Sequence, residues 1–361
     1  MLAILWIWMV FFLVSLLSTV RSYHLGLTEI ANSAHDGAAL FVCALFSIAL
    51  VNFLKSDEIV LRFVAMFSVV SAAAIGVLLV LAATRSELAG INPWYAAIRF
   101  TGWSVNPNQL GLFLVAIPYL WAWNRLERRR PLLSVGMILI IVAGIATQSD
   151  ALFVSWLCGT LFVLTMGWCQ ALALPDRSLP KSIFRLVLLP AMAISFVGVL
   201  FWVFAEGAAE LLIGRYELGG QGSTRFEIWA NALAAIADSP VIGNGVGAFA
   251  GVWAPFSGYE AHNTYLDLGT KAGLFVTFAY SVFSIGLILR LVMQREVLMA
   301  GAFTSLVVFS VFHYVLRQPV YWMTVVICLQ IACRPDELRK ARVESASKVH
   351  VPMYLLKAVR D

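Results

Sequence analysis

The sequence has few charged residues. Among its 361 residues, Asp, Glu, Lys and Arg account for 12%, whereas hydrophobic residues account for 61% and the mean hydropathy is +0.86. A soluble domain averages about 25% charged residues, and a water-soluble fold of this length could not bury so much apolar surface. The composition therefore excludes an ordinary soluble protein and predicts that lipid surrounds part of the chain.

The alternation of apolar and polar residues that marks a transmembrane β-barrel is also lacking. The apolar runs are continuous, and helices are the other structure that satisfies every backbone hydrogen bond within hydrocarbon. We expect an all-α polytopic membrane protein with about ten transmembrane helices. The expected spans are the apolar runs at 2–20, 37–54, 59–83, 108–123, 132–148, 150–170, 183–205, 263–289, 297–315 and 319–333.

Motifs of metal, nucleotide and hydrolase sites are absent. The five cysteines form no CxxC pair and no cluster with histidine, so neither a disulfide framework nor a zinc site is expected. The phosphate loop GxxxxGK[ST], the HExxH pair and the GxSxG elbow do not occur. Basic residues cluster beside apolar segments in a chain of net charge +5. We therefore expect no cofactor and no nucleic acid partner.

The placement of Lys and Arg predicts the orientation. If the N-terminus is cytoplasmic and every span crosses, most of the 25 basic residues fall in cytoplasmic loops or the tail, as the positive-inside rule requires. We expect N-terminal spans at 1–205, a large periplasmic loop at 206–262, C-terminal spans at 263–333 and a basic cytoplasmic tail at 334–361. Both termini would be cytoplasmic, in a bacterial inner membrane.

The loop 206–262 is much longer than the others, and long loops in compact proteins are usually functional or disordered. Thr224 to Glu227 form a capping-box pattern that predicts a helix, and three glycines at 243, 245 and 247 predict an irregular turn. We expect this loop to fold as a small lid on the outer membrane surface. Asp and Glu are nearly absent from the spans except for Asp267, which counts against an ion-coupled transporter.

Arginines outside the cytoplasm are the exceptional charges. Arg215 and Arg225 flank a polar stretch, and Arg225 would begin a helix, where backbone N–H groups favour an anion. Two guanidiniums there suit a phosphate or diphosphate, although each could equally be a surface residue paired with a nearby glutamate. Arg99 lies in a second outside loop, at 84–107.

His262 would open the eighth span, either as a functional group or as an interfacial anchor of the helix end. Asp267 and Lys271 are four residues apart, so they could form an ion pair on one helix face. Charges inside a membrane are functional by default, but for this pair we favour a structural role that holds the helix in register.

The segment from Arg225 to Gly273 resembles the O-antigen ligase and polymerase superfamily of bacterial glycan-assembly proteins. The resemblance is carried by the sequence HNTYL at 262–266, by Gly273, by an arginine that starts the loop helix and by the turn at 243–249. The segments 99–102 and 106–108 are also similar, so it covers roughly residues 99–280. The family often has Ser-Arg-Gly after its fifth or sixth span, and this chain has Ser149-Asp150-Ala151 instead.

The resemblance implies a metal-independent membrane glycosyltransferase. The donor would be a polyprenyl-diphosphate-linked glycan, the acceptor a hydroxyl of a glycan or of a lipid A-core type molecule, and the site would be periplasmic. The implied catalytic residues are His262, Arg225 and Arg215. The implied substrate-binding residues are Arg99, Asn263, Tyr265 and Lys271. The alternatives are a transporter or flippase of lipid-linked oligosaccharide, which would need no base, and an inactive subunit of a glycan-assembly complex.

Overall fold

The computed structural model describes residues 2–26, 30–87, 90–96, 98–128, 134–172, 221–247 and 259–334. The predicted span at 183–205, the loop residues 206–220 with Arg215, and the basic tail after residue 334 lie outside the described residues.

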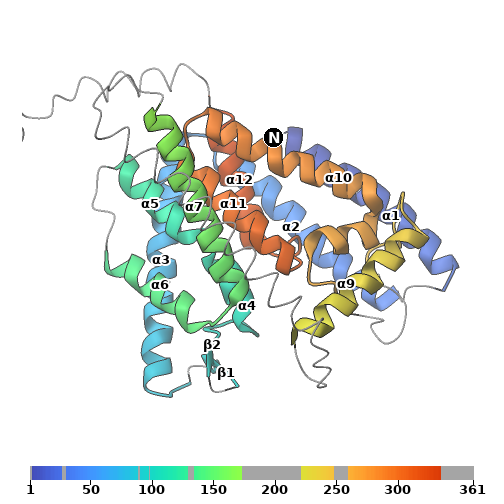
Figure 1. The fold of residues 1–361 in the computed structure, drawn as a ribbon, viewed down its shortest axis with the longest axis horizontal. Helices are drawn as coiled ribbons and strands as arrows, with labels where there is room; N and C mark the ends of the chain where they lie inside the picture. The colour runs from blue at the N-terminus through green and yellow to red at the C-terminus, as the bar shows by residue number, and fades with distance from the viewer. Residues whose placement is uncertain are drawn as a thin grey trace, which may run out of the picture.

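The described chain is almost entirely helical (Figure 1). Its helices are α1 (Leu2–His24), α2 (Ile30–Phe53), α3 (Asp57–Ala83), α4 (Pro107–Leu114), α5 (Ile117–Glu127), α6 (Val135–Ala146), α7 (Asp150–Leu172), α9 (Gln221–Asp238), α10 (Thr264–Met293), α11 (Val297–Phe312) and α12 (Pro319–Ala332). Two short antiparallel strands, β1 (Trp94–Tyr95) and β2 (Arg99–Phe100), pair in the loop before α4.

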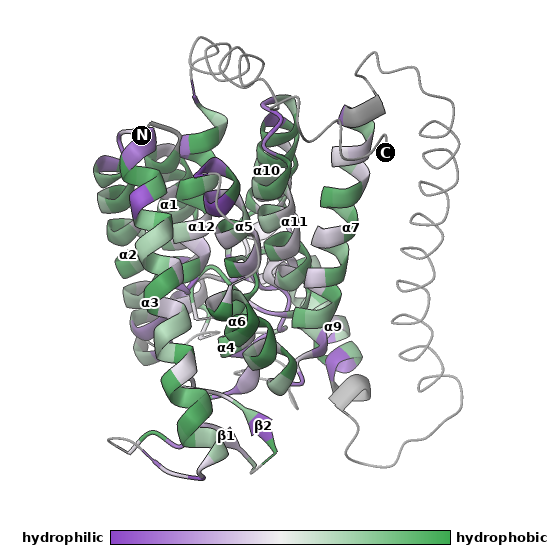
Figure 2. Cartoon of the chain, turned by 90° about the vertical axis from the view of Figure 1, so that its left-hand side faces the viewer, coloured by the Kyte–Doolittle hydropathy of each residue, from purple (hydrophilic) through white to green (hydrophobic). Residues whose placement is uncertain are grey.

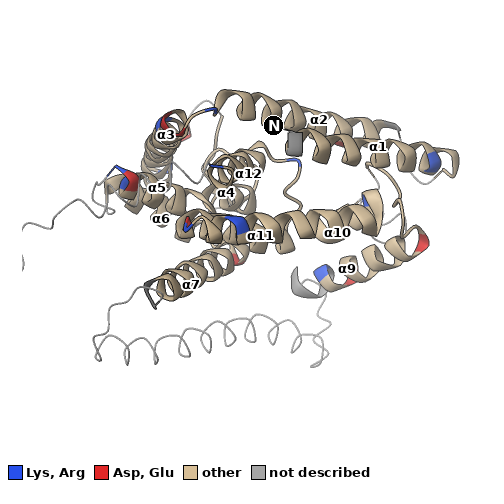
Figure 3. Cartoon of the chain, turned by 90° about the horizontal axis from the view of Figure 1, so that it is seen from above, with Lys and Arg blue, Asp and Glu red and all other residues tan. Residues whose placement is uncertain are grey.

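The helices are those of a multi-pass membrane protein. By length and composition, α1, α2, α3, α7 and α10 could each cross a membrane, and α6, α11 and α12 are shorter apolar helices. Hydrophobic residues cover most of the bundle, and charged residues are sparse on it (Figures 2 and 3). The predicted all-α membrane fold is confirmed at this level, because apolar helices of this length bury their backbone polar groups internally.

Two predicted boundaries were wrong. The span predicted at 108–123 is two short helices, α4 and α5, because Pro118 has no N–H to donate to the carbonyl of Leu114 and its ring blocks a continuous helix. Helix α2 begins at Ile30, seven residues before the predicted start at 37, so that Asp36 belongs to the helix. Asp36 is fully buried there, which the sequence had not indicated.

Helix α11 lies at the centre of the bundle, packed against α7, α10, α5 and α12 (Figure 1). Small residues allow α7 and α11 to approach closely: a Cβ atom at Gly159 would lie 2.8 Å from the Gly301 carbonyl oxygen, and one at Gly301 would lie 2.2 Å from Val163. Close packing at small residues drives helix association in lipid, where the hydrophobic effect between helices is weak. The aromatic side chains of Phe303 and Phe309 are fully buried around this contact.

Helix α10 is kinked at Gly273, whose φ of 82° and ψ of 174° break the helix. The turn 240–247, which follows α9, docks against this break. Backbone N–H groups of Asn244 and Gly245 donate to the carbonyls of Thr270 and Lys271, at 2.6 and 2.9 Å, and the Leu274 N–H donates to Pro240 at 2.7 Å. The turn thus satisfies helix groups that the kink leaves unpaired and fixes α9 beside the first part of α10.

Candidate functional site

A polar pocket of about 480 Å³ opens at one end of the bundle, which we call the loop end. It is lined by residues of the hairpin 94–100, of α4, of α9 and of the segments 259–262 and 313–318. Its wall carries three arginines and two histidines, which are Arg99, Arg225, His262, His313 and Arg317. Segments far apart in the sequence therefore contribute one concentrated group of cationic and imidazole side chains.

The backbone on both sides of His262 is fixed by one carboxylate. Asp267 is fully buried, and its Oδ1 and Oδ2 atoms accept hydrogen bonds from the N–H groups of Ala261 at 2.9 Å and of Asn263 at 3.3 Å. His262 itself has a φ of 50°, a left-handed conformation that is uncommon for residues other than glycine. The two hydrogen bonds hold this conformation and thereby direct the imidazole to the pocket.

Two further hydrogen bonds tie the neighbouring elements to His262. The indole Nε1 of Trp229 on α9 donates to the Ala261 carbonyl at 2.8 Å. The Thr264 hydroxyl donates to the His313 carbonyl at 2.6 Å and accepts from the Val315 N–H at 3.1 Å. Helix α9 and the segment 313–318 therefore keep fixed positions around the imidazole.

Burial lowers the pKa of both histidines of the pocket and so favours the neutral imidazole. Burial lowers the pKa of His262 below 6.5; the Glu260 carboxylate opposes this shift, while Arg225 and Arg317 add to it. Burial, Arg225 and His262 lower the pKa of His313 to about 3. The ring centroids are 6.1 Å apart. His262, with a ring nitrogen free of its proton and access to the pocket, can act as a base.

Helix α9 begins at Gln221, so the predicted helix start at Arg225, with a capping box from Thr224, was wrong. Arg225 lies in the second turn of α9 and is partly buried in the pocket wall. Burial lowers the pKa of its guanidinium, Asp150 raises it, and Arg99 lowers it further. Arg99 donates to the carbonyls of Thr147 and Gln148, both at 3.0 Å. These carbonyls directly follow the last residue of α6, at the C-terminal end of the helix dipole, where a positive charge is favourable. Arg99 is thus anchored on α6 and still lines the pocket.

Arg317 connects the pocket to a buried group of charges. Its guanidinium pairs with Glu260 and, at 2.5 Å, with Asp36, whose other oxygen is 2.7 Å from Lys271 Nζ. The centre of the Tyr314 ring lies near both cations, 3.9 Å from Lys271 Nζ and 5.3 Å from the Arg317 guanidinium carbon. These charges balance, which is the condition under which a buried ionic group is tolerated.

The structure brings together Arg99, Arg225 and His262, all three predicted from the sequence. Asn263, Tyr265 and Lys271, which the resemblance implied as substrate-binding residues, do not line the pocket. The Asn263 side chain caps α10 by accepting from the N–H groups of Tyr265 and Leu266 at 3.0 and 3.2 Å.

The ring of Tyr265 points into the bundle, 5.5 Å from the Tyr280 ring. Lys271 is fully buried and paired with Asp36, so the ion pair predicted within one helix is replaced by one between α10 and α2. The carboxylate predicted as its partner, Asp267, instead binds the backbone beside His262.

Glu260, Arg317 and His313 also line the pocket, and none of them was predicted as a site residue from the sequence. The sequence does contain an indication that Arg317 has a specific role, because the positive-inside rule disfavours an arginine in an outside loop. His313 Nε2 and the Tyr314 hydroxyl have no hydrogen-bond partner within the described part of the chain, although both residues line the pocket. Both atoms are buried in the pocket wall.

A second, apolar groove of about 460 Å³ adjoins the polar pocket and shares Gln109 and Gln318 with it. Aromatic and aliphatic side chains from α2, α3, α4 and α12 line most of it, including Phe46, Phe67 and Met323.

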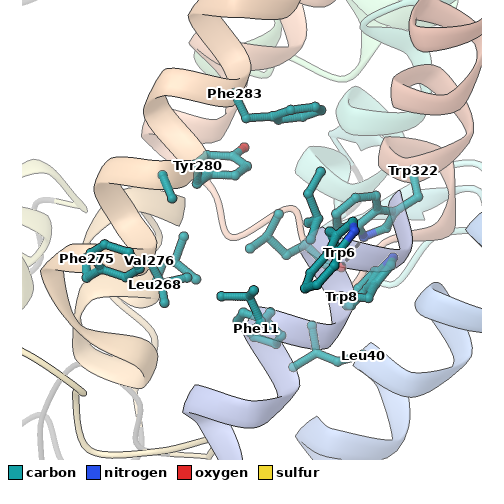
Figure 4. Close-up of a pocket in the computed structure, with 14 residues that line it drawn as sticks. Trp6, Trp8, Phe11, Leu40, Leu268, Phe275, Val276, Tyr280, Phe283 and Trp322 are labelled. Atoms are coloured by element: carbon teal, nitrogen blue, oxygen red, sulfur yellow. Dashed lines mark hydrogen bonds between the residues drawn. The ribbon is translucent and has the colours of Figure 1, made fainter. Parts of the chain in front are cut away.

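A third cavity, of about 320 Å³, lies between α1, α10 and α12 (Figure 4). Its wall is formed almost wholly by apolar side chains, among them Trp6, Phe11 and Phe283, with Tyr280 as a polar exception. It shares no residue with the polar pocket, so it is not part of the same site.

Residues 135–281 match the family model described as O-antigen ligase. The matched region contains Arg225, His262 and the kink at Gly273, whereas Arg99 and Arg317 lie outside it. The predicted resemblance to the O-antigen ligase and polymerase superfamily is confirmed. No curated protein matches the chain significantly.

Proposed function

We propose that the protein transfers a glycan from polyprenyl diphosphate to an acceptor hydroxyl, because residues 135–281 match the family model described as O-antigen ligase. The loop end would face the periplasm of a bacterial inner membrane, with both termini in the cytoplasm. The acceptor would be a growing glycan, in a polymerase, or a lipid A-core type molecule, in a ligase.

One observation carries the proposal: Arg99, Arg225 and His262 line one pocket although the sequence separates them widely. Departure of a lipid diphosphate leaves negative charge on the phosphate oxygens, and positioned guanidiniums stabilise that charge. Attack by an acceptor hydroxyl requires loss of its proton, and His262 holds a free nitrogen at the pocket wall. The reaction needs no further activation, since the glycan–diphosphate bond is already reactive.

The apolar groove beside the pocket supplies a place for the donor's polyprenyl chain. It meets the pocket at Gln109 and Gln318 and is lined by residues of α2, α3, α4 and α12. Burial of hydrocarbon there would hold the diphosphate at the level of the arginines.

Replacement of the proposed base and of one cation tests the function. We expect His262→Ala and Arg225→Ala to reach the membrane in normal amounts and to abolish glycan transfer in a deletion strain. Arg85→Ala is the matched control, because Arg85 is exposed near the loop end and does not line the pocket. Wild-type surface glycan from either pocket variant would refute the assigned roles.

A glycan gel of the deletion strain separates the two reaction types. Loss of a polymerase leaves single repeat units on the final carrier, whereas loss of a ligase leaves long chains on the lipid intermediate. Purified protein that turns over donor and acceptor in detergent would show that transfer, rather than transport, is the activity.

A further inference from the structure

Arg317 is a third cation of the polar pocket, and it is held by two carboxylates that differ in their surroundings. The side chain of Asp36 is 0% exposed, whereas those of Glu260 and Arg317 are 18% and 21% exposed. Both Glu260 and Arg317 line the pocket, and Asp36 does not. A ligand in the pocket could therefore reach the Glu260–Arg317 ion pair but not the Asp36–Arg317 pair.

The Asp36 carboxylate is held by two cationic side chains at once. It accepts from Lys271 Nζ at 2.7 Å as well as from Arg317, and Lys271 is itself 0% exposed. Removing a carboxylate from two buried cations would leave uncompensated charge, which is strongly unfavourable. In the described ion pairs Glu260 has no second cationic partner besides Arg317, and it lies on the irregular segment before α10. Of the two carboxylates, Glu260 is the exchangeable one.

We propose that Glu260 is a built-in counter-ion which the donor's diphosphate displaces from Arg317, so that Arg317 joins Arg99 and Arg225 in binding the leaving group. The proposal rests on the proposed function and names a further binding residue of the same site. A phosphate and a carboxylate present similar pairs of oxygens to the planar guanidinium fork, so one can replace the other.

The charges of the pocket explain why a counter-ion is needed. In the empty pocket Arg99, Arg225 and Arg317 would repel one another in partly buried surroundings, where solvent screens charge less than in bulk water. Glu260 offsets this repulsion until a diphosphate brings more negative charge than one carboxylate. After the exchange the guanidinium is still paired, and Glu260 is released toward the pocket two residues from His262.

Glu260 also acts on His262 through its charge. Among the described residues, the charged or titratable groups that act on His262 are Glu260, Arg225, Arg317 and His313, and of these Glu260 raises the pKa of the imidazole. A neutral residue at position 260 removes that effect and leaves the cations. The acid limb of the transfer rate would then move to lower pH, which a purely structural role for Glu260 would not cause.

The test is binding of a polyprenyl diphosphate, without glycan, to the purified full chain in detergent. We expect Glu260→Gln to bind this probe more tightly than wild type, on the order of tenfold, because the competitor for one charge-assisted interaction is gone. Glu227→Gln removes one exposed negative charge from α9 without lining the pocket and should leave the affinity unchanged. In an Arg317→Lys background the gain from Glu260→Gln should shrink, since lysine lacks the fork.

Equal or weaker binding by Glu260→Gln would overturn the exchange, and so would a gain that persists in full with lysine at 317. An acid limb that stays at the wild-type pH would also count against it. A wild-type protein with no measurable affinity for the probe would instead refute the proposed function itself. The two failures are therefore distinguishable.

Discussion

Adding one carbon atom at Gly273, as in Gly273→Ala, should strongly destabilise the folded protein. The φ of 82° and ψ of 174° at Gly273 lie in a region that is essentially confined to glycine. A Cβ atom there would lie 2.2 Å from the Val241 carbonyl oxygen and 2.4 Å from its carbon. These are backbone atoms of the docked turn, so no side chain can rotate out of the way.

The cost of Gly273→Ala follows from two contributions. Alanine in this conformation is strained by about 1–3 kcal/mol. To reach ordinary contact distance the Val241 carbonyl must also retreat by more than ~1 Å, and such overpacking typically costs about 1–3 kcal/mol. The sum, about 2–6 kcal/mol, is a large share of the about 5–15 kcal/mol that stabilises a typical protein. The retreat would also break the short hydrogen bond from Leu274 N–H to Pro240.

Thermal unfolding of the purified protein, with glycan transfer as a second readout, measures the effect. Gly286→Ala on the same helix is the control, because a Cβ atom there meets nothing within 4 Å; it should be neutral or slightly stabilising. We expect Gly273→Ala to unfold at a clearly lower temperature and to lose activity, since the turn fixes α9 and α9 holds the His262 segment. Equal stability of the two variants would refute the argument that the kink requires glycine.

Two further predictions concern the proposed base. Burial lowers the pKa of His262 below 6.5. The transfer rate should therefore be constant through pH 7–8 and should fall as the pH drops through a value below 6.5, because the imidazole then gains a proton. A kcat/KM profile with its acid limb above 6.5 would contradict this prediction. Asp267→Asn replaces one of the two oxygens that accept the Ala261 and Asn263 N–H groups with an amide donor. A buried N–H group left without an acceptor costs about 1–3 kcal/mol, so kcat should fall on the order of tenfold or more with little change in probe affinity, and an unchanged kcat would sink the positioning role.

The coarse fold and three of the pocket's residues could be predicted because they depend on local patterns. Continuous apolar runs indicate helices in any membrane protein, and an arginine outside the cytoplasm needs a reason regardless of its partners. Arg99, Arg225 and His262 were therefore found as separate residues. That all three line one pocket follows only from the three-dimensional arrangement.

The remaining site residues depend on contacts between distant segments. Asp36 pairs with Lys271, 235 residues away, and with Arg317, 281 residues away. No local sequence pattern indicates an ion pair between such distant residues. In addition, the second span was predicted to start at residue 37, which left Asp36 outside the helix. For the same reason Asp267 was matched with Lys271, its neighbour at i+4, although its oxygens bind the backbone at Ala261 and Asn263.

An experimental structure of the protein with a bound polyprenyl diphosphate would test the central claim most directly. The account predicts the phosphate oxygens within hydrogen-bonding distance, about 3 Å, of the Arg225 guanidinium, in front of His262, with the hydrocarbon chain in the groove that contains Phe46 and Met323. A diphosphate bound at the opposite end of the bundle, or one that leaves the pocket at Arg225 and His262 empty, would contradict it.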